Sequence, residues 1–333
     1  MRPRHIALAV AVAAAWGFNF VVIDVGLREF PPLLFSALRF ALAAFPAVLL
    51  VGPPRVPWRW VFAVGAALAV AKFSLLFLGM AAGMPAGLSS VVLQGQAIFT
   101  VLFAVLLLGE RPGRRQLAGL GVATAGIAVV AARLGPDRPA AAFVLVLGAA
   151  VCWGVANIAM RRANPPDTLR FMVWVSATAP LPLLALSLLT EGPAADLAAL
   201  RGIDWTGVGA LGYIAGVSTL AGFGAWGALI RRYGASSVAP FSMFVPFFGM
   251  ASAALLLGEP VHPTDVLGGL LVVGGVLAGA VRSRSLDPHA AEGTTLVVEG
   301  GNHGVHGGEG GPALRRDGAD AAPLRRDRAA VAE

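Results

Sequence analysis

The sequence predicts an all-α membrane protein with ten transmembrane helices arranged as two inverted five-helix repeats. Three observations predict this fold: the composition, the division of the chain into apolar segments, and an internal repeat. Hydrophobic residues make up 57% of the 333 residues and charged residues only 13%, with a mean hydropathy of +0.76. Soluble domains carry about a quarter charged residues, so the expected partner of this chain is the lipid bilayer.

Charges, prolines and glycines divide the first 281 residues into apolar segments of nearly equal length. A helix of about 20 residues crosses the roughly 30 Å hydrocarbon core of a bilayer. Ten segments come close to that length, at residues 6–27, 32–51, 60–81, 86–108, 116–133, 141–160, 168–190, 205–230, 235–257 and 264–281. Because ten is an even number, both chain termini are expected on the same side of the membrane.

Arginines mark one side of the predicted membrane protein. One set of segment ends holds fourteen of them: Arg2, Arg4, Arg55, Arg59, Arg111, Arg114, Arg115, Arg161, Arg162, Arg170, Arg231, Arg232, Arg282 and Arg284. The opposite set holds four: Arg28, Arg133, Arg138 and Arg201. Cytoplasmic loops carry the excess of basic residues, so the N- and C-termini are expected in the cytoplasm. The net charge of +7 is therefore an orientation signal, and no nucleic-acid partner is expected.

The internal repeat is clearest between residues 83–110 and 234–259. Both stretches contain Gly-x-Ser-Ser-Val and both end in Leu-Leu-Leu-Gly-Glu, while Trp16-Gly17 in the first segment has a counterpart in Trp153-Gly154. The repeats are expected at 6–133 and 141–281. Each holds five segments, an odd number, so the second repeat is inverted. Inverted repeats are typical of secondary transporters, in which two halves expose a central site alternately.

Five polar residues within the predicted helices are candidates for binding a small-molecule substrate. They are Asn19, Arg39, Lys72, Gln94 and Gln96, and Lys72 is the only lysine in the chain. At about 1.5 Å per residue, four of them come from four helices to a similar depth, roughly 10–13 Å below one membrane surface. Polar and charged side chains in a bilayer are costly and usually functional. Because two of the candidates are cations, a carboxylate on the substrate would suit the site.

For several residues in the predicted helices, the sequence leaves more than one role open. Asp24 is expected to pair with Arg39 or Lys72, and Lys72 could instead take part in proton coupling. Glu110 and Glu259 end their helices, so structural hydrogen bonds are expected for them. The candidate pathway aromatics are Trp16, Phe20, Trp153 and Trp226, although aromatic residues in a helix bundle more often serve in packing.

Several features limit the other functions open to the chain. The predicted helices contain no cluster of histidines and acids and no paired carboxylates, so no metal, no cofactor and no enzyme active site are expected. The single cysteine, Cys152, excludes an intrachain disulfide. Pro240 and Pro246 predict a broken ninth helix. Residues 285–333, rich in glycine, are expected to form a disordered cytoplasmic tail. Both a monomer and a homodimer remain open.

A set of motifs distributed over both halves carries a family resemblance. These motifs are residues 16–22 (Trp-Gly-Phe-Asn-Phe-Val-Val), Pro31-Pro32 with Arg39-Phe40, residues 83–88, residues 93–100, residues 222–227, residues 238–246 and the paired Leu-Gly-Glu endings. With them the chain resembles the EamA family of the drug/metabolite transporter superfamily, over about residues 6–281. The resemblance implies ten helices in two inverted repeats, a bacterial inner-membrane location, and export of small metabolites such as O-acetylserine and cysteine.

Other transport classes remain as alternatives. Arg39 and Lys72 would also suit an organic-anion or sugar-phosphate exchanger of the same superfamily. A multidrug cation pump is less favoured, because the first predicted helix has no glutamate and the buried charges would repel a cation. A membrane-embedded enzyme is the least favoured class.

Overall fold

The computed structural model describes residues 1–132 and 140–280, which lie within one compact unit, Met1–Gly300. Each of the ten predicted segments is helical, and the described residues contain no strand. Among the described residues, seven helices are long and apolar enough to cross a membrane, and two shorter apolar helices cover Pro32–Phe45 and Pro263–Gly279. The prediction of an all-α membrane fold is confirmed. The expected tail at 285–333 lies outside the described residues.

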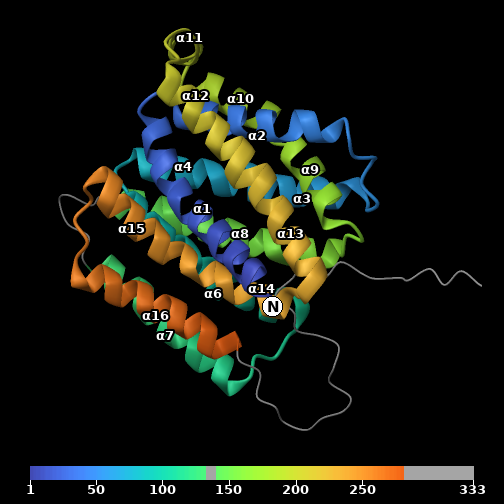
Figure 1. Cartoon of the computed structure of the whole chain (residues 1–333), viewed down its shortest axis with the longest axis vertical. Coiled ribbons are helices and arrows are strands. Elements are labelled where there is room, and N and C mark those ends of the chain that lie inside the picture. Colours follow the sequence, from blue (N-terminus) through green and yellow to red (C-terminus); the bar gives the residue numbers. More distant parts are fainter. Residues whose placement is uncertain (133–139, 281–333) are drawn as a thin grey trace, which may run out of the picture. The chain divides into compact units, whose positions relative to one another are not determined.

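The first repeat comprises five helical passes (Figure 1). They are α1 (Pro3–Leu27); α2 (Pro32–Val48); α3 (Trp58–Val64), η1 (Gly65–Lys72) and α4 (Phe73–Ala81); α5 (Ala86–Val92), η2 (Leu93–Gly95) and α6 (Gln96–Leu108); and α7 (Arg114–Ala131). The third pass is thus interrupted by a π-helical segment, η1, and the fourth by a 3₁₀ turn, η2.

The second repeat has the same plan, with one additional short helix. Its elements are α8 (Ala140–Ala163); α9 (Thr168–Ala177) and α10 (Pro180–Thr190); the additional α11 (Pro193–Arg201); α12 (Trp205–Gly212), η3 (Tyr213–Ala221) and α13 (Gly222–Tyr233); α14 (Ala235–Val238), η4 (Ala239–Phe244) and α15 (Val245–Leu257); and α16 (Pro263–Ala280). The eighth pass again contains a π-helical segment, η3, and the ninth again contains a 3₁₀ segment, η4, as the two prolines predicted.

Two pairs of glycines show that the repeats share their local structure. Gly109 and Gly258 end the fourth and ninth passes in the same left-handed conformation, with φ of 69° and 68°. A Cβ atom on Gly17 of α1 would lie 2.8 Å from the backbone nitrogen of Gly249 in the ninth pass. A Cβ on Gly154 of α8 would lie 2.8 Å from the Cβ of Phe99 in the fourth pass. The first and sixth passes therefore make equivalent close contacts, each with the other repeat.

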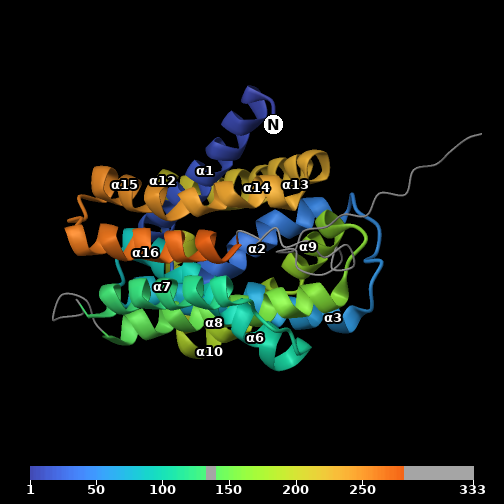
Figure 2. The ribbon, with the colours of Figure 1, turned by 90° about the horizontal axis from the view of Figure 1, so that it is seen from below.

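The packing of α7 against α16 shows the inversion directly (Figures 1 and 2). Gly119, near the start of α7, lies against Gly275 and Gly279, whereas Gly126 lies against Gly268, near the start of α16. The partner number falls as the residue number rises, so these equivalent helices are antiparallel. Glycine lets the two backbones approach closely, as in other small-residue interfaces between membrane helices.

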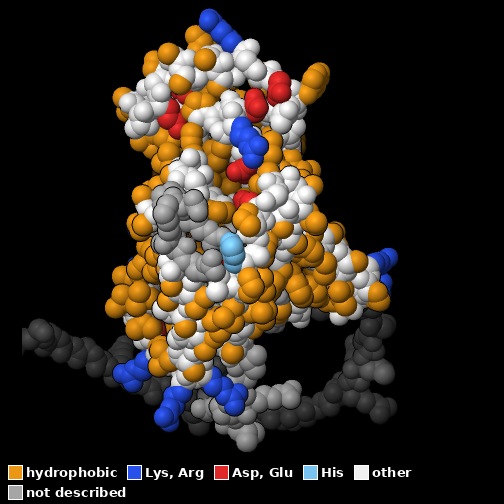
Figure 3. Space-filling view, turned by 90° about the vertical axis from the view of Figure 1, so that its left-hand side faces the viewer, with side chains coloured by type: hydrophobic (Ala, Val, Ile, Leu, Met, Phe, Trp, Pro, Cys, Tyr) orange, Lys and Arg blue, Asp and Glu red, His pale blue; other side chains and the backbone are white. Residues whose placement is uncertain are grey.

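Connections predicted on the same side of the membrane meet one another. At one end, which we call the arginine-rich end, Arg161 pairs with Glu110, the Trp174 ring nitrogen donates to the carbonyl of Gly52 at 2.9 Å, and the side chains of His5 and Tyr233 are hydrogen-bonded. At the other, which we call the acidic end, Glu191 and Glu259 accept hydrogen bonds from the first residues of α2 and α5. Figure 3 shows a broad band of hydrophobic side chains, with a group of basic side chains at its lower end and most of the visible acidic side chains, together with some basic ones, in the upper part.

The buried hydrophobic side chains form one large cluster in the acidic-end half of the bundle and two smaller, separate clusters. One large cluster includes Ile23, Phe35, Phe77, Val91 and Ile214 and so ties together the acidic-end halves of α1, α2, α4, α5 and the eighth pass. A second cluster joins α2, α3 and α9, among other elements, and a third is confined to α1, α13 and α14. The two halves of the bundle are thus held together more extensively at the acidic end.

Candidate functional site

The centre of the bundle contains two buried cations that share one aromatic ring. Arg39 of α2 is 4% exposed and Lys72, the last residue of η1, is 5% exposed. The guanidinium carbon of Arg39 lies 4.0 Å, and Nζ of Lys72 3.4 Å, from the centroid of the Phe73 ring. Nζ of Lys72 is also 4.7 Å from the Trp153 ring of α8. Cation–π contacts offset part of the cost of burying these charges but supply no negative charge.

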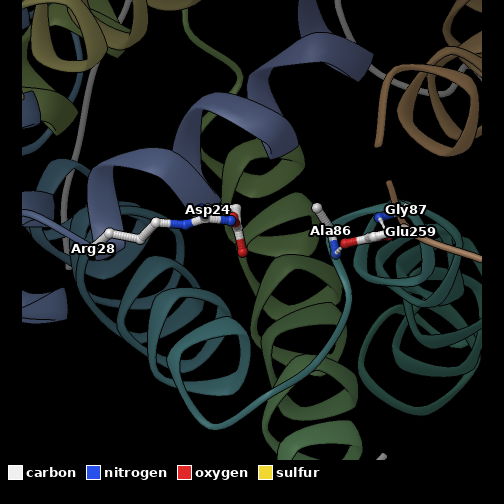
Figure 4. A network of polar contacts seen from close by, with 5 residues as sticks. All are labelled: Asp24, Arg28, Ala86, Gly87 and Glu259. Carbon is white, nitrogen blue, oxygen red and sulfur yellow. Dashed lines mark hydrogen bonds and ion pairs between the residues drawn. The ribbon is translucent and has the colours of Figure 1, made fainter. Parts of the chain in front are cut away.

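The expected partner of the two cations pairs elsewhere. Asp24 accepts from Arg28, one helical turn further along α1, at 2.7 Å (Figure 4). The prediction that Asp24 pairs with Arg39 or Lys72 is therefore wrong, because the i,i+4 arginine is close enough on the same helix face. Within residues 1–132 and 140–280, no carboxylate lies at ion-pair distance from Arg39 or Lys72.

Arg39 is incompletely hydrogen-bonded. Its Nη2 donates to the hydroxyl of Thr219 in η3 at 3.4 Å, while its buried Nε and Nη1 have no partner among the described residues. Thr219 was missed by the sequence reasoning, although the repeat offered a signal. It follows Trp205, the first residue of α12, by as many residues as Lys72 follows Trp58, the first residue of α3. The two positions are thus equivalent in the two repeats.

A second polar group joins the fourth and sixth passes. Asn157 of α8 donates its side-chain amide to Oε1 of Gln96 at 2.8 Å and to the hydroxyl of Thr100 at 2.9 Å. Asn157 lies one helical turn beyond Trp153, toward the arginine-rich end. The sequence reasoning found Gln96 but not Asn157 or Thr100, because a single amide or hydroxyl in an apolar helix carries little signal by itself.

The two remaining predicted amides, Asn19 and Gln94, are buried in their helices. Asn19 is 7% exposed, and its Oδ1 has no hydrogen-bond partner among the described residues. Gln94 is 8% exposed and lies within the 3₁₀ turn η2. Phe20 is 6% exposed and packs in the large hydrophobic cluster, which favours a packing role for it. Among the described residues, Asn19, Gln94 and Phe20 make no hydrogen bond, ion pair or cation–π contact with Arg39 or Lys72.

The candidate tryptophans form two groups, one around Trp16 of α1 and one around Trp153 of α8, the first helices of the two repeats. The rings of Trp16 and Trp226 are tilted against each other, with centroids 5.0 Å apart. The ring nitrogen of Trp16 donates to the carbonyl of Ser218 in η3 at 3.0 Å. Trp153 instead contacts Lys72, at the end of η1. Each tryptophan therefore lies against the π-helical segment of the opposite repeat. The structure brings Trp153 together with the cations and leaves Trp16 and Trp226 as a separate pair.

The two Leu-Gly-Glu endings have structural roles, as predicted. Glu259 accepts from the backbone nitrogens of Ala86 and Gly87, at 2.6 and 3.0 Å, and so caps the start of α5 (Figure 4). Glu110 pairs with Arg161. A pocket of about 260 Å³ adjoins the Glu259 cap, between α5 and the α15–α16 connection, and none of the candidate substrate-binding residues lines it. Within the described ranges, no group of three or more His, Cys, Asp or Glu residues could hold a metal.

Comparisons with known proteins identify the class of protein to which these two inverted repeats belong. The sequence profile of the EamA-like transporter family matches residues 4–132 and 140–278, so the chain belongs to this family. The resemblance found in the sequence is thereby confirmed, and the chain is a multi-pass membrane protein of a transporter family.

Curated relatives cover nearly the whole transporter. The chain is 42% identical over 275 residues to a Salmonella typhimurium protein named "Probable amino-acid metabolite efflux pump", covering 81% of this chain and 92% of the relative. An Escherichia coli protein of the same name is 40% identical over 282 residues, covering 83% and 94%. A protein of known crystal structure has a TM-score of 0.56 at 19% identity, over 84% of this chain and 96% of the other, which shows the shared fold alone.

Proposed function

We propose that the chain exports amino acids or their derivatives, such as O-acetylserine and cysteine, by alternating access. Arg39 binds the carboxylate of the cargo, and Lys72, Trp153 and the amides of Asn19, Gln94 and Gln96 complete the site. Trp16, Phe20 and Trp226 belong to the walls of the pathway. The observation that carries the proposal is the buried pair Arg39 and Lys72, which has no carboxylate partner in the described residues.

The physical basis is the cost of an unpaired buried charge. Burying a cation without a counter-charge is expensive, and removing one partner of a buried pair typically costs about 3–5 kcal/mol. A guanidinium with free N–H groups is suited to a carboxylate, because it can form two parallel charge-assisted hydrogen bonds. A carboxylate-bearing cargo would therefore be drawn to Arg39 and would complete its hydrogen bonding. The printed names of the two enterobacterial relatives favour an amino-acid metabolite as that cargo.

Alternating access is supported by the distribution of packing. The largest buried cluster lies in the acidic-end half of the bundle, whereas the cluster of α1, α13 and α14 at the arginine-rich end is small and separate from the second cluster. Opening between the second and third clusters would therefore disrupt less packing than opening the acidic end. The family resemblance implies an inner-membrane location, and the arginine distribution favours both termini in the cytoplasm, so this opening would face the cytoplasm. The cargo would enter there, and separation of the large cluster would release it outside.

Efflux from loaded vesicles tests the proposal. Vesicles containing the full chain would be loaded with radiolabelled O-acetylserine, cysteine and a panel of amino acids. We expect Arg39→Gln to slow efflux of the preferred cargo by about 30-fold or more, since loss of a buried charged contact costs at least about 2 kcal/mol. Arg28→Gln is the matched control, because the Arg28 side chain is 66% exposed. A folded Arg39→Gln variant that exports every cargo at the wild-type rate would refute the assigned site.

The same two cations support a second candidate, exchange of organic anions or sugar phosphates. A phosphate can accept from Arg39 and Lys72 as a carboxylate does. Counterflow distinguishes the two: vesicles loaded with unlabelled sugar phosphate should not accelerate uptake of labelled sugar phosphate if the first proposal is right. Acceleration by the sugar phosphate, with no effect of amino-acid derivatives, would favour the exchanger.

A further inference from the structure

We infer that Lys72 makes this transporter selective for amino-acid derivatives with a net negative charge, in which the amine is acylated or otherwise uncharged, over zwitterionic amino acids. The inference rests on the proposed function, because it ranks the substrates of the same carboxylate site and places anionic derivatives above the zwitterions O-acetylserine and cysteine. It follows from the position of Lys72 relative to Arg39 and from the acceptors that surround them.

The two cations are close neighbours. Both lie against the ring of Phe73, at 4.0 and 3.4 Å from its centroid, so they cannot be farther apart than these two distances combined. Both are at least nine-tenths buried. A carboxylate bound to Arg39 therefore lies in the neighbourhood of Lys72. One substrate carboxylate then serves two positive groups.

The amine of an α-amino acid is only two bonds from its carboxylate carbon. A free ammonium group would thus be held close to Lys72 whenever the carboxylate is held by Arg39. Two like charges near each other in a low-dielectric site repel strongly. A zwitterion brings no net charge, so it leaves the excess of positive charge in the site unchanged. An anion with a neutral amide in place of the ammonium offsets one of the two positive charges of the site with its carboxylate and brings no positive charge of its own.

The hydrogen-bond acceptors near these helices also suit a neutral amide. An ammonium needs several acceptors and, in a buried site, a carboxylate. Asp24, the acid that the sequence suggested as the partner of the two cations, is paired with Arg28. The available acceptors are neutral: Oδ1 of Asn19 and the hydroxyl of Ser36, three residues before Arg39 on α2, are buried without partners among the described residues. A single amide N–H needs one such acceptor.

Two isomers of acetylserine test the inference with no difference in composition. O-acetylserine has a free ammonium and no net charge at about pH 6, whereas N-acetylserine has a neutral amide and one negative charge. Proteoliposomes with the purified full chain would be loaded separately with each labelled isomer at that pH, at which the ammonium does not attack the acetyl ester. We expect N-acetylserine to leave about tenfold faster than O-acetylserine. Lys72→Gln should bring this ratio close to one, and Lys72→Arg should retain it.

Each outcome decides the inference. Equal or faster efflux of O-acetylserine from the wild-type chain would overturn it while leaving the proposed export of amino-acid derivatives standing. A wild-type preference that persists in Lys72→Gln would also overturn it, because the preference would then have another origin. If the wild-type chain moves neither isomer and no amino acid, the proposed function fails, and the inference fails with it. The wild-type comparison holds even if a Lys72 variant does not fold.

Discussion

The two repeats share a backbone plan but differ in the polarity of their centres. Both have a π-helical segment in their third pass, a 3₁₀ segment in the fourth and a left-handed glycine before the terminal glutamate. At equivalent positions, however, the first repeat has Lys72 and the second has Thr219. Both repeats thus maintain the fold, whereas the buried positive charge of Arg39 and Lys72 is concentrated in the first repeat. A symmetric scaffold can rock between two states around a site that is itself asymmetric.

The largest expected effect is on the packing that the repeats share. Gly17→Ala and Gly154→Ala would each place a methyl group 2.8 Å from an atom of the opposite repeat. We expect both variants to lose about 1–3 kcal/mol of stability, since overpacking forces the helices apart. Thermal unfolding of the purified protein in detergent measures the loss.

The matched control for these glycines is Gly121→Ala in α7. No atom lies within 4 Å of the Cβ it would add, and alanine is the better helix former. Its unfolding temperature should equal or exceed that of the wild type. If Gly17→Ala were harmless while Gly154→Ala unfolded the protein, the equivalence of the two contacts would be broken.

A smaller loss of stability is expected from substitutions of the glutamates in the two Leu-Gly-Glu endings, whose contacts differ. Glu259→Gln weakens two hydrogen bonds to the start of α5 and removes a negative charge from that helix end, so we expect a loss of about 1–2 kcal/mol. Glu110→Gln affects a pair with Arg161 whose side chains are 32% and 21% exposed, and should cost less than about 1 kcal/mol. The same unfolding assay ranks the two variants. The reverse order would show that Glu110 has partners beyond Arg161.

The smallest effect concerns Thr219. Thr219→Val removes the hydroxyl that accepts from Arg39 and donates to the carbonyl of Ile214. The net value of such hydrogen bonds is about 1 kcal/mol, so efflux should fall about fivefold. Thr124→Val is the control, because its hydroxyl also donates to a backbone carbonyl, that of Leu120, on an exposed face of α7. A similar loss in both variants would remove Thr219 from the site.

The sequence was sufficient for the helices because length and hydropathy decide membrane insertion. All ten segments were located within a few residues, and the broken ninth pass followed from Pro240 and Pro246. The short α11 was missed because it has neither the length nor the apolar character of a membrane span. The π-helical segments were missed as well, since a change from i→i+4 to i→i+5 hydrogen bonding has no residue signature.

For the candidate site the sequence identified the costly residues but not their partners. Arg39 and Lys72 were recognised because charges are rare in membrane helices. The pairing of Asp24 was assigned to the wrong cation, although Arg28 at i+4 was visible in the sequence. Thr219 and Asn157 are neutral and small, so nothing in their own helices distinguished them from packing residues. Aligning the repeats residue by residue would have identified Thr219 as the counterpart of Lys72.

The most direct test of the account is cargo binding to the purified chain in detergent, measured by equilibrium dialysis with labelled O-acetylserine and N-acetylserine. The account predicts saturable binding of the preferred isomer to the wild-type chain and to Arg28→Gln, with affinity reduced about 30-fold or more in Arg39→Gln. Unchanged affinity in a folded Arg39→Gln variant would contradict the claim that the cationic centre of the first repeat holds the cargo.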